Sequence, residues 1–231
     1  MSAELIHQMY IAYYQRPADP AGLAYWQAQL TANGGGEAGW NAVAAAFANA
    51  AESSNLYGSQ TLEQKISAIY LAAFERAAVD SEVSFWASSG FTEAQIAFAI
   101  VNGAQNDDLS TVSTKVTYAT NFVAALDPAG TGVGPFEYEY NDPSIGRTLL
   151  DVVTKDSDVS TATVNSQVSA NVPTLTTVNL TSGQDTVTPT PNSVEHINAA
   201  LGGSSPSLGR TDQIDGGSGL DTMTVTTDGN F

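Results

Sequence analysis

The chain has 231 residues, with 24 Asp and Glu against 7 Lys and Arg for a net charge of −17, and it contains no cysteine. An acidic excess of this size repels phosphate backbones and anionic headgroups, which argues against nucleic acid and lipid surfaces as partners. The absence of cysteine excludes disulfides, thiolate nucleophiles and cysteine-ligated metal sites.

The N-terminal segment indicates neither a signal peptide nor a membrane anchor. It begins Met-Ser-Ala-Glu-Leu-Ile-His, with an acid where a signal peptide carries lysine or arginine, and no apolar run follows. Nowhere does the sequence approach the roughly 18 consecutive apolar residues that a membrane crossing needs. We therefore expect no membrane insertion, and either a cytosolic protein or one exported without an N-terminal signal.

The composition changes partway along the chain. Residues 1–126 contain 28 Ala and 7 Thr, whereas residues 127–231 contain 5 Ala and 17 Thr. This is a change from helix-favouring to strand-favouring composition. Gly and Pro concentrate in residues 127–135, as is typical of a linker. We therefore predict an all-α domain over residues 1–128, a linker over 129–150 and a Thr-rich, mainly β domain over 151–231.

The first 128 residues show the apolar periodicity of amphipathic helices. Stripes at helical spacing lie within residues 6–14, 23–30, 40–47, 66–74 and 112–126. Between the first two stripes, Asp19 is placed as an N-cap and Pro20 as the first helical residue. Thr61 and Thr92 each stand three residues before a glutamine, which is capping-box spacing and predicts two further helix starts.

The helical half contains an internal repeat. The segment from Ile6 to Trp26 recurs sixty residues later, from Ile66 to Trp86, without a gap. The matching pairs are Ile6 and Ile66, Tyr10 and Tyr70, Tyr14 and Phe74, Arg16 and Arg76, Tyr25 and Phe85, and Trp26 and Trp86. In the second copy Asp80 stands opposite Pro20, and we expect its second helix to begin one residue later.

The repeated aromatic and arginine residues admit two interpretations. In the first they are structural: the two arginines brace the loop against a helix end or an acid, and the two tryptophans fill the core. In the second an exposed subset binds sugar or a partner protein. The candidate glycan-binding residues are Tyr13, Tyr14, Arg16, Tyr25 and Trp40.

The second half favours strands and carries one metal motif. Residues 161–168 and 175–180 alternate β-branched and polar residues, the pattern of half-exposed strands. Residues 216–224 fit the nonapeptide G-G-x-G-x-D-x-U-x, whose turn carbonyls and aspartate suit the roughly six to eight hard oxygens of Ca²⁺. The candidate ligands are Asp212, Asp215, Gly217, Gly219 and Asp221. Because one nonapeptide supplies only half a cage, an Asp-Gly-Gly turn in an ordinary sheet is the alternative.

The pattern Tyr-x-x-x-(Tyr/Phe)-x-Arg-x-x-Asp-Pro-x-Gly-Leu-x-Tyr-Trp resembles the helical DUF4214 module of bacterial exported and surface-layer proteins. The resemblance covers residues 4–128 and weakens in the second copy. There Pro17, Pro20 and Gly22 are replaced by Ala77, Asp80 and Glu82. Followed by the nonapeptide, the module is similar to the N-terminal region of calcium-dependent surface-layer (S-layer) and RTX-type proteins.

We therefore predict a multidomain fold: an all-α N-terminal helical bundle, then a mainly β domain that starts a β-roll or β-solenoid-like region. The resemblance implies an extracellular cell-surface anchoring segment of an S-layer protein, exported by type I secretion. Its helical domain would bind surface polysaccharide such as lipopolysaccharide O-chains. Its β part would lead into a Ca²⁺-dependent homo-oligomeric lattice, and the chain would be the N-terminal piece of a longer protein.

Two other functions stay open at this point. The chain is alternatively the N-terminal region of a type I-secreted adhesin or RTX enzyme, or an intracellular linker-like scaffold. Only His7 and His196 are available as histidines, so the H-E-x-x-H zinc motif is impossible, and no Walker or dinucleotide-binding loop is present. We expect no enzymatic activity in this chain.

Overall fold

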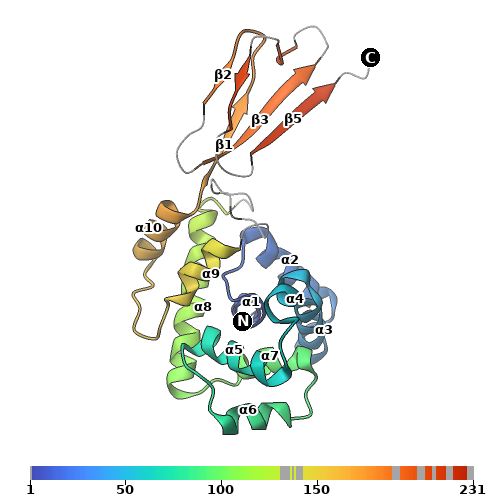
Figure 1. The fold of residues 1–231 in the computed structure, drawn as a ribbon, viewed down its shortest axis with the longest axis vertical. Coiled ribbons are helices and arrows are strands. Elements are labelled where there is room, and N and C mark those ends of the chain that lie inside the picture. The colour runs from blue at the N-terminus through green and yellow to red at the C-terminus, as the bar shows by residue number, and fades with distance from the viewer. Residues whose placement is uncertain are drawn as a thin grey trace. The chain divides into compact units, whose positions relative to one another are not determined.

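A computed structural model describes residues 2–130, 136, 138, 143–188, 193–201, 206–209, 212–216 and 221–227. The chain divides into two compact units: the helical unit, residues 1–133 and 139–168, and the sheet unit, residues 134–138 and 169–231. The helices are α1 Ser2–Tyr14, α2 Pro20–Ala32, α3 Gly36–Asn49, α4 Ala51–Tyr57, α5 Leu62–Phe74, α6 Asp80–Ala87, α7 Glu93–Asn102, α8 Asn106–Leu126, α9 Ser144–Asp151 and α10 Thr161–Asn171 (Figure 1). Within the described residues, no helix combines the length and the apolar composition that a membrane crossing requires.

The helical unit is built around α1. This helix lies at the centre of the unit and contacts α2, α3, α4, α5, α7 and α8 (Figure 1). Its aliphatic side chains Ile6, Met9 and Ile11 are fully buried, and the rings of Tyr10 and Tyr13 are buried as well. A helix with apolar or aromatic side chains on nearly every face is stable only when other helices surround it.

The sixty-residue repeat forms two helix pairs, α1–α2 and α5–α6. The first helix of each pair ends before a residue in the left-handed conformation, Gln15 in one copy and Glu75 in the other, both at φ 57°. This conformation costs a non-glycine residue about 1 kcal/mol, and in each copy the side chain has a partner that holds it. Gln15 Nε2 donates to the Tyr57 hydroxyl (2.9 Å), and the Glu75 carboxylate accepts from the Lys115 ammonium.

The second helices of the two pairs begin at equivalent positions. Asp19 caps α2 as predicted, accepting a hydrogen bond from a first-turn backbone amide at 2.6 Å, and Pro20 is the first helical residue. Helix α6 begins at Asp80, sixty residues after Pro20, so our expectation of a start one residue later was wrong. In place of an N-cap side chain, the Glu82 carboxylate accepts the Val79 amide (2.9 Å), which stabilises the start of the helix.

Both predicted capping boxes are confirmed. The Thr61 side chain accepts from the Gln64 amide while the Gln64 side chain accepts from the Thr61 amide, and Thr92 and Gln95 repeat this exchange. Each exchange satisfies two backbone donors that a helix start leaves without partners. The starts of α5 and α7 are therefore set by local sequence alone.

The sheet unit contains two small parallel sheets among its described residues. Its strands are β1 Thr174–Asn179, β2 Thr186–Val187, β3 Ser193–Leu201, β4 Gln213–Ile214 and β5 Thr222–Thr227. Strands β1, β3 and β5 form one sheet in that order, and β2 pairs with β4 in the other. The small core of the unit consists of Leu180, Val187, Ile197 and Ala199.

The fold class that we predicted was wrong. An all-α bundle followed by a mainly β domain that starts a β-roll or β-solenoid-like region was expected, but the structure is mixed α/β, with 58% helix and 12% strand. Helix α9 lies in the stretch expected to be a linker, and α10 lies in the stretch expected to be β. The strands that do form make only the two small parallel sheets.

Helix α10 shows why the strand prediction for residues 161–168 failed. Val164 and Val168 stand four residues apart and both are completely buried, which is the spacing of one helix face. Before the helix, the Asp158 carboxylate accepts from the Ser160 amide (2.9 Å) and from the Thr163 hydroxyl (2.6 Å). Burial of this face and stabilisation of the helix start outweigh the β propensity of Thr and Val.

Helix α9 belongs to the core of the helical unit. Its Leu150 is 1% exposed, and its Arg147 donates to the Tyr14 carbonyl (3.0 Å) and to Glu52 (2.6 Å). The Leu150 carbonyl accepts from the Lys115 ammonium (3.1 Å). The second half of the expected linker is thus a packed structural element.

We predict that acid destabilises the helical unit through His7. This side chain is 1% exposed in α1, its Nδ1 has no hydrogen-bond partner among the described residues, and burial lowers the pKa of His7 to about 4. The unfolded chain, with a histidine pKa near 6.5, therefore binds the proton first as pH falls. Between pH 7 and 4.5 the free energy of unfolding should drop by about 2 kcal/mol on this account.

Urea unfolding followed by tryptophan fluorescence tests this, because all three tryptophans, Trp26, Trp40 and Trp86, lie in the helical unit. A His7→Leu variant should lose that share of the pH dependence, whereas a His196→Gln variant in the sheet unit should keep it. Equal pH slopes for His7→Leu and the native chain would contradict the assignment.

Candidate functional site

In the first repeat copy the arginine is buried in an ion pair. Arg16 is 2% exposed, and its Nε and Nη2 donate to the two carboxylate oxygens of Glu52 at 2.8 and 3.0 Å. Its Nη1 donates to the Pro17 carbonyl (3.0 Å), and its guanidinium lies over the rings of Tyr10 and Tyr14, 5.1 and 5.6 Å from their centroids. The arginine thus fixes the loop between α1 and α2 against α4.

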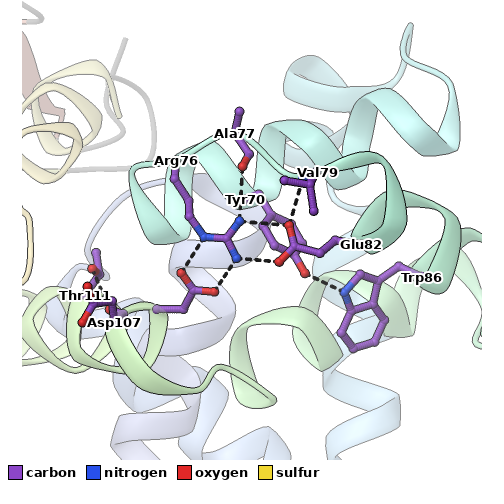
Figure 2. A network of polar contacts seen from close by, with 9 residues as sticks. Tyr70, Arg76, Ala77, Val79, Glu82, Trp86, Asp107 and Thr111 are labelled. Atoms are coloured by element: carbon purple, nitrogen blue, oxygen red, sulfur yellow. Dashed lines mark hydrogen bonds and ion pairs between the residues drawn. The ribbon is translucent and has the colours of Figure 1, made fainter.

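In the second copy the equivalent arginine is accessible. Arg76, 37% exposed, bonds Asp108 with Nε and Nη2 (2.8 and 2.7 Å) and Glu82 with Nη1 and Nη2 (2.9 and 2.6 Å). Figure 2 shows its guanidinium between the loop and Glu82, close to the Tyr70 ring, whose centroid is 5.0 Å away. Hydrogen bonds to Glu82 and Asp108 raise the pKa of Arg76, and the bond from Arg76 lowers the pKa of Glu82.

Each copy exposes one aromatic ring at the same position. Tyr25 on α2 is 55% exposed and Phe85 on α6 is 63% exposed. Each ring stands edge-on against the tryptophan that follows it: Tyr25 against Trp26 at 5.0 Å and 77°, and Phe85 against Trp86 at 5.1 Å and 78°. We call these the two aromatic pairs, Tyr25–Trp26 and Phe85–Trp86.

The two aromatic pairs differ in what covers their tryptophans. The Trp26 ring packs on Phe47 of α3, with 4.5 Å between centroids. The ring nearest to Trp86 beyond its own pair is that of Phe91, 6.3 Å away between centroids, and Phe91 is itself 49% exposed. Helix α6 buries none of its residues, and Trp86 Nε1 donates to the Tyr70 hydroxyl (2.9 Å; Figure 2). The second pair is therefore the more open one.

The structure does not bring the five predicted glycan-binding residues together on one surface. Tyr13, Tyr14 and Arg16 are buried at 2%, 5% and 2% exposure, and burial raises the pKa of both tyrosines. Trp40 is half-buried and stacks on Phe98. Of the predicted set, Tyr25 is exposed and belongs to an aromatic pair.

Sequence reasoning missed Phe85, Trp86 and Arg76 as surface residues. The repeat aligned them with Tyr25, Trp26 and Arg16, but the alignment does not reveal that Trp26 packs on the buried Phe47 whereas Trp86 lies against the exposed Phe91. Extended past Trp86, the sixty-residue register places Asp107 opposite Phe47 and so offers no ring at that position.

The described aspartates of the predicted calcium motif serve the backbone of the sheet unit. The Asp212 carboxylate accepts from the Gly209 amide (2.6 Å) and the Asp185 amide (3.0 Å), and Asp221 accepts from the Glu195 amide (3.0 Å). A Cβ on Gly216 would meet the Asp221 carboxyl carbon at 2.7 Å, so a larger residue there would displace the Asp221 side chain.

The carboxylates of Asp212 and Asp221 thus have backbone amides as partners, and their positions are explained without a bound ion. Asp215 donates its amide to the Val187 carbonyl (3.1 Å), and Gly217 and Gly219 lie outside the described residues. Over the part of the chain that the structure describes, no three acidic or histidine side chains gather as metal ligands would. Calcium binding by residues 212–221 stays a prediction from the sequence.

Comparison with protein-family models, with curated proteins and with solved structures gives no significant match to this chain.

We predict that the two repeat arginines, Arg16 and Arg76, contribute unequally to the free energy of unfolding. Replacing Arg16 by lysine removes a bidentate contact in a buried site and should cost about 2 kcal/mol of unfolding free energy. The matched Arg76→Lys change, at an exposed site, should cost less than about 1 kcal/mol. Urea unfolding followed by tryptophan fluorescence compares them, and equal losses would contradict the difference in burial.

We predict that Asp212 contributes to the acid sensitivity of the sheet unit. The Gly209 and Asp185 amides lower the pKa of Asp212 below its ordinary value near 3.8. Its contribution to stability is therefore present above about pH 4 and is lost as pH falls through the lower, folded-state pKa. In an NMR pH titration, Asp212→Asn should abolish the acid-linked shift of the Gly209 amide, and its persistence would refute the assignment.

Proposed function

We propose that this chain is a bacterial cell-surface protein whose helical unit binds surface polysaccharide through the two aromatic pairs. The observation that carries the proposal is the repetition of one arrangement, an exposed ring edge-on against a tryptophan, in both copies. An exposed Phe or Tyr in isolation needs no explanation, but the same exposed ring at the same repeat position supports a shared binding role.

The chemistry around the aromatic pairs suits an uncharged polyhydroxyl ligand. The exposed rings offer apolar faces for the C–H side of a sugar. In the first turn of α6, the helix that carries Phe85, Glu82 bonds Arg76, which also bonds Asp108, and the two carboxylates keep lone pairs for sugar hydroxyls. Such contacts do not require a positive net charge, so they are compatible with the −17 of the chain.

Two equivalent sites on one unit suit a polymer of repeating sugars. When one pair has bound a polysaccharide chain, the second pair meets further repeats of that chain at a raised effective concentration. Weak single contacts then add up to firm retention, as an anchoring function requires.

The wider biological proposal rests on the family resemblance. It makes the chain the extracellular anchoring segment of an S-layer protein, exported by type I secretion, whose assembly into a lattice depends on Ca²⁺. The acidic, cysteine-free composition agrees with this placement. A type I-secreted adhesin or RTX enzyme and an intracellular scaffold are the competing functions.

We expect ring removal to weaken retention on immobilised cell-envelope polysaccharide. Tyr25→Ala and Phe85→Ala should each lower the apparent affinity about tenfold, and the double variant about a hundredfold or more, because the stacking contacts and the bivalent gain are both lost. Affinity chromatography with and without Ca²⁺ measures this.

Val152→Ala provides the matched control, since Val152 is 68% exposed and lies in neither repeat copy. It should bind like the native chain. Undiminished retention of the double variant would refute the aromatic pairs as sugar contacts. Failure of the native chain to bind envelope polysaccharide under either condition would refute the anchoring function itself.

A further inference from the structure

The chain contains two Asn-Gly pairs, Asn33-Gly34 and Asn102-Gly103, at the C-terminal ends of α2 and α7. Glycine has no side chain to shield its backbone nitrogen, so that nitrogen can attack the side-chain amide of the asparagine before it. Asparagine is a thermally labile residue for this kind of reason. Both pairs lie in the helical unit, and neither takes part in the proposed sugar contacts. Their surroundings differ.

The first pair lies in an open turn between α2 and α3. Asn33 is the C-cap residue of α2, and its neighbours Thr31, Ala32 and Gly34 are exposed, as Asn33 is. Gly34 has a φ of 84°, in the left-handed region that glycine adopts at no steric cost. A Cβ built on Gly34 would meet no atom within 4 Å. The rest of the protein therefore does not crowd this glycine.

Two local hydrogen bonds hold the first pair. The Asn33 side-chain amide donates to the Gln29 carbonyl (2.8 Å), and the Gly34 backbone amide donates to the Thr31 carbonyl (3.0 Å). Both must open before the Gly34 nitrogen reaches the side-chain carbon of Asn33. Because Ala32 and Gly34 on either side are exposed, the backbone can rotate here while the core stays packed. Openings of this kind lie at the low end of the free-energy scale for local unfolding.

The second pair follows two buried residues. Ile100 and Val101, directly before Asn102, are 2% and 1% exposed, and their helix α7 contacts α1, α3 and α5. The Gly103 amide donates to the Ala99 carbonyl (2.9 Å), and a Cβ on Gly103 would come within 2.8 Å of that oxygen. Rotating the backbone at Asn102 therefore disturbs the end of a packed helix, which costs more than opening an exposed turn.

We propose that Asn33 is a site of spontaneous deamidation in the folded protein and that the fold protects Asn102. The Gly34 backbone nitrogen gives its proton to hydroxide and forms a bond to the Asn33 side-chain carbon. The bond from that carbon to Nδ2 breaks, and Nδ2 leaves as ammonia after taking a proton from water. Water then opens the resulting succinimide ring at one of its carbonyls and gives aspartate or isoaspartate. The reaction uses no oxidant or reductant.

The reaction alters the C-terminal end of α2. A carboxylate takes the place of the amide that donates to the Gln29 carbonyl, so this hydrogen bond is lost. The new negative charge stands at the end of the helix where the helix dipole is also negative, which is unfavourable. Ageing of the protein therefore loosens the last turn of α2.

Peptide mapping by mass spectrometry tests the proposal after incubation of the full chain in mildly alkaline buffer. Trypsin cuts at Lys65 and Arg76, so the two Asn-Gly pairs fall in different peptides. Asn33 should deamidate at least about tenfold faster than Asn102, because only Asn102 requires a packed segment to open. Equal rates in the folded chain, or no product at Asn33, would overturn the proposal.

The chain unfolded in urea provides the control for local sequence. Unfolding removes the difference in surroundings, so both pairs should then react at similar rates, and Asn102 should gain more than Asn33. Tryptophan fluorescence shows which state is incubated. If Asn33 kept its full lead in urea, the preference would come from neighbouring residues, and protection of Asn102 by the fold would be refuted.

A pair of glycine variants tests the attacking atom. Gly34→Ala places a methyl group beside the attacking nitrogen and should slow deamidation of Asn33 about tenfold. Gly36→Ala is the matched control, because Gly36 also has a positive φ, 58°, and open space around it, but its nitrogen does not attack. It should leave the rate at Asn33 close to that of the native chain. Equal slowing by the two variants would contradict attack by the Gly34 nitrogen.

Discussion

An arginine directly after a left-handed residue ties together each helix pair of the helical unit. Arg16 and Arg76 occupy this position, and in each copy the guanidinium meets a carboxylate from the first turn of a later helix, α4 or α8. Because a guanidinium bonds a carboxylate through two parallel hydrogen bonds, it fixes orientation as well as distance. In each copy, this ion pair therefore sets the position of the loop, of the helix that follows it and of the aromatic ring on that helix.

The two copies use this shared geometry differently. Around Arg16 the rings of Tyr10 and Tyr14 exclude solvent, and Glu52 also accepts from Arg147 of α9, so the first ion pair belongs to the core. Around Arg76 the rings of Tyr70 and Phe74 lie at similar distances, 5.0 and 5.9 Å, but the arginine side chain stays 37% exposed and its pair with Asp108 is in contact with water. A duplicated unit can thus keep one copy for stability while the other remains accessible.

Short-range sequence patterns predicted local structure correctly. They failed where contacts with residues far along the chain determine the structure. The capping boxes at Thr61 and Thr92 depend on residues three positions away, and they could be identified from sequence alone. The partner of Arg16 lies 36 residues further along the chain, so only the folded structure identifies Glu52. Residues 161–168 carry both a two-residue alternation and a four-residue valine spacing, and tertiary burial of Val164 and Val168 selects the helix. The same limit applied to the site, because helical periodicity does not tell a covered aromatic ring from an open one.

The central position of α1 affects the order in which the helical unit folds. This helix is synthesised before the other helices of the unit, yet it contacts α7 and α8, which are complete only at residues 102 and 126. Until those helices exist, part of its apolar and aromatic surface has nothing to pack against. Contacts that span so much of the sequence carry a large loop-closure cost and slow folding. The core of the helical unit therefore closes late, when its last long helix becomes available to its first.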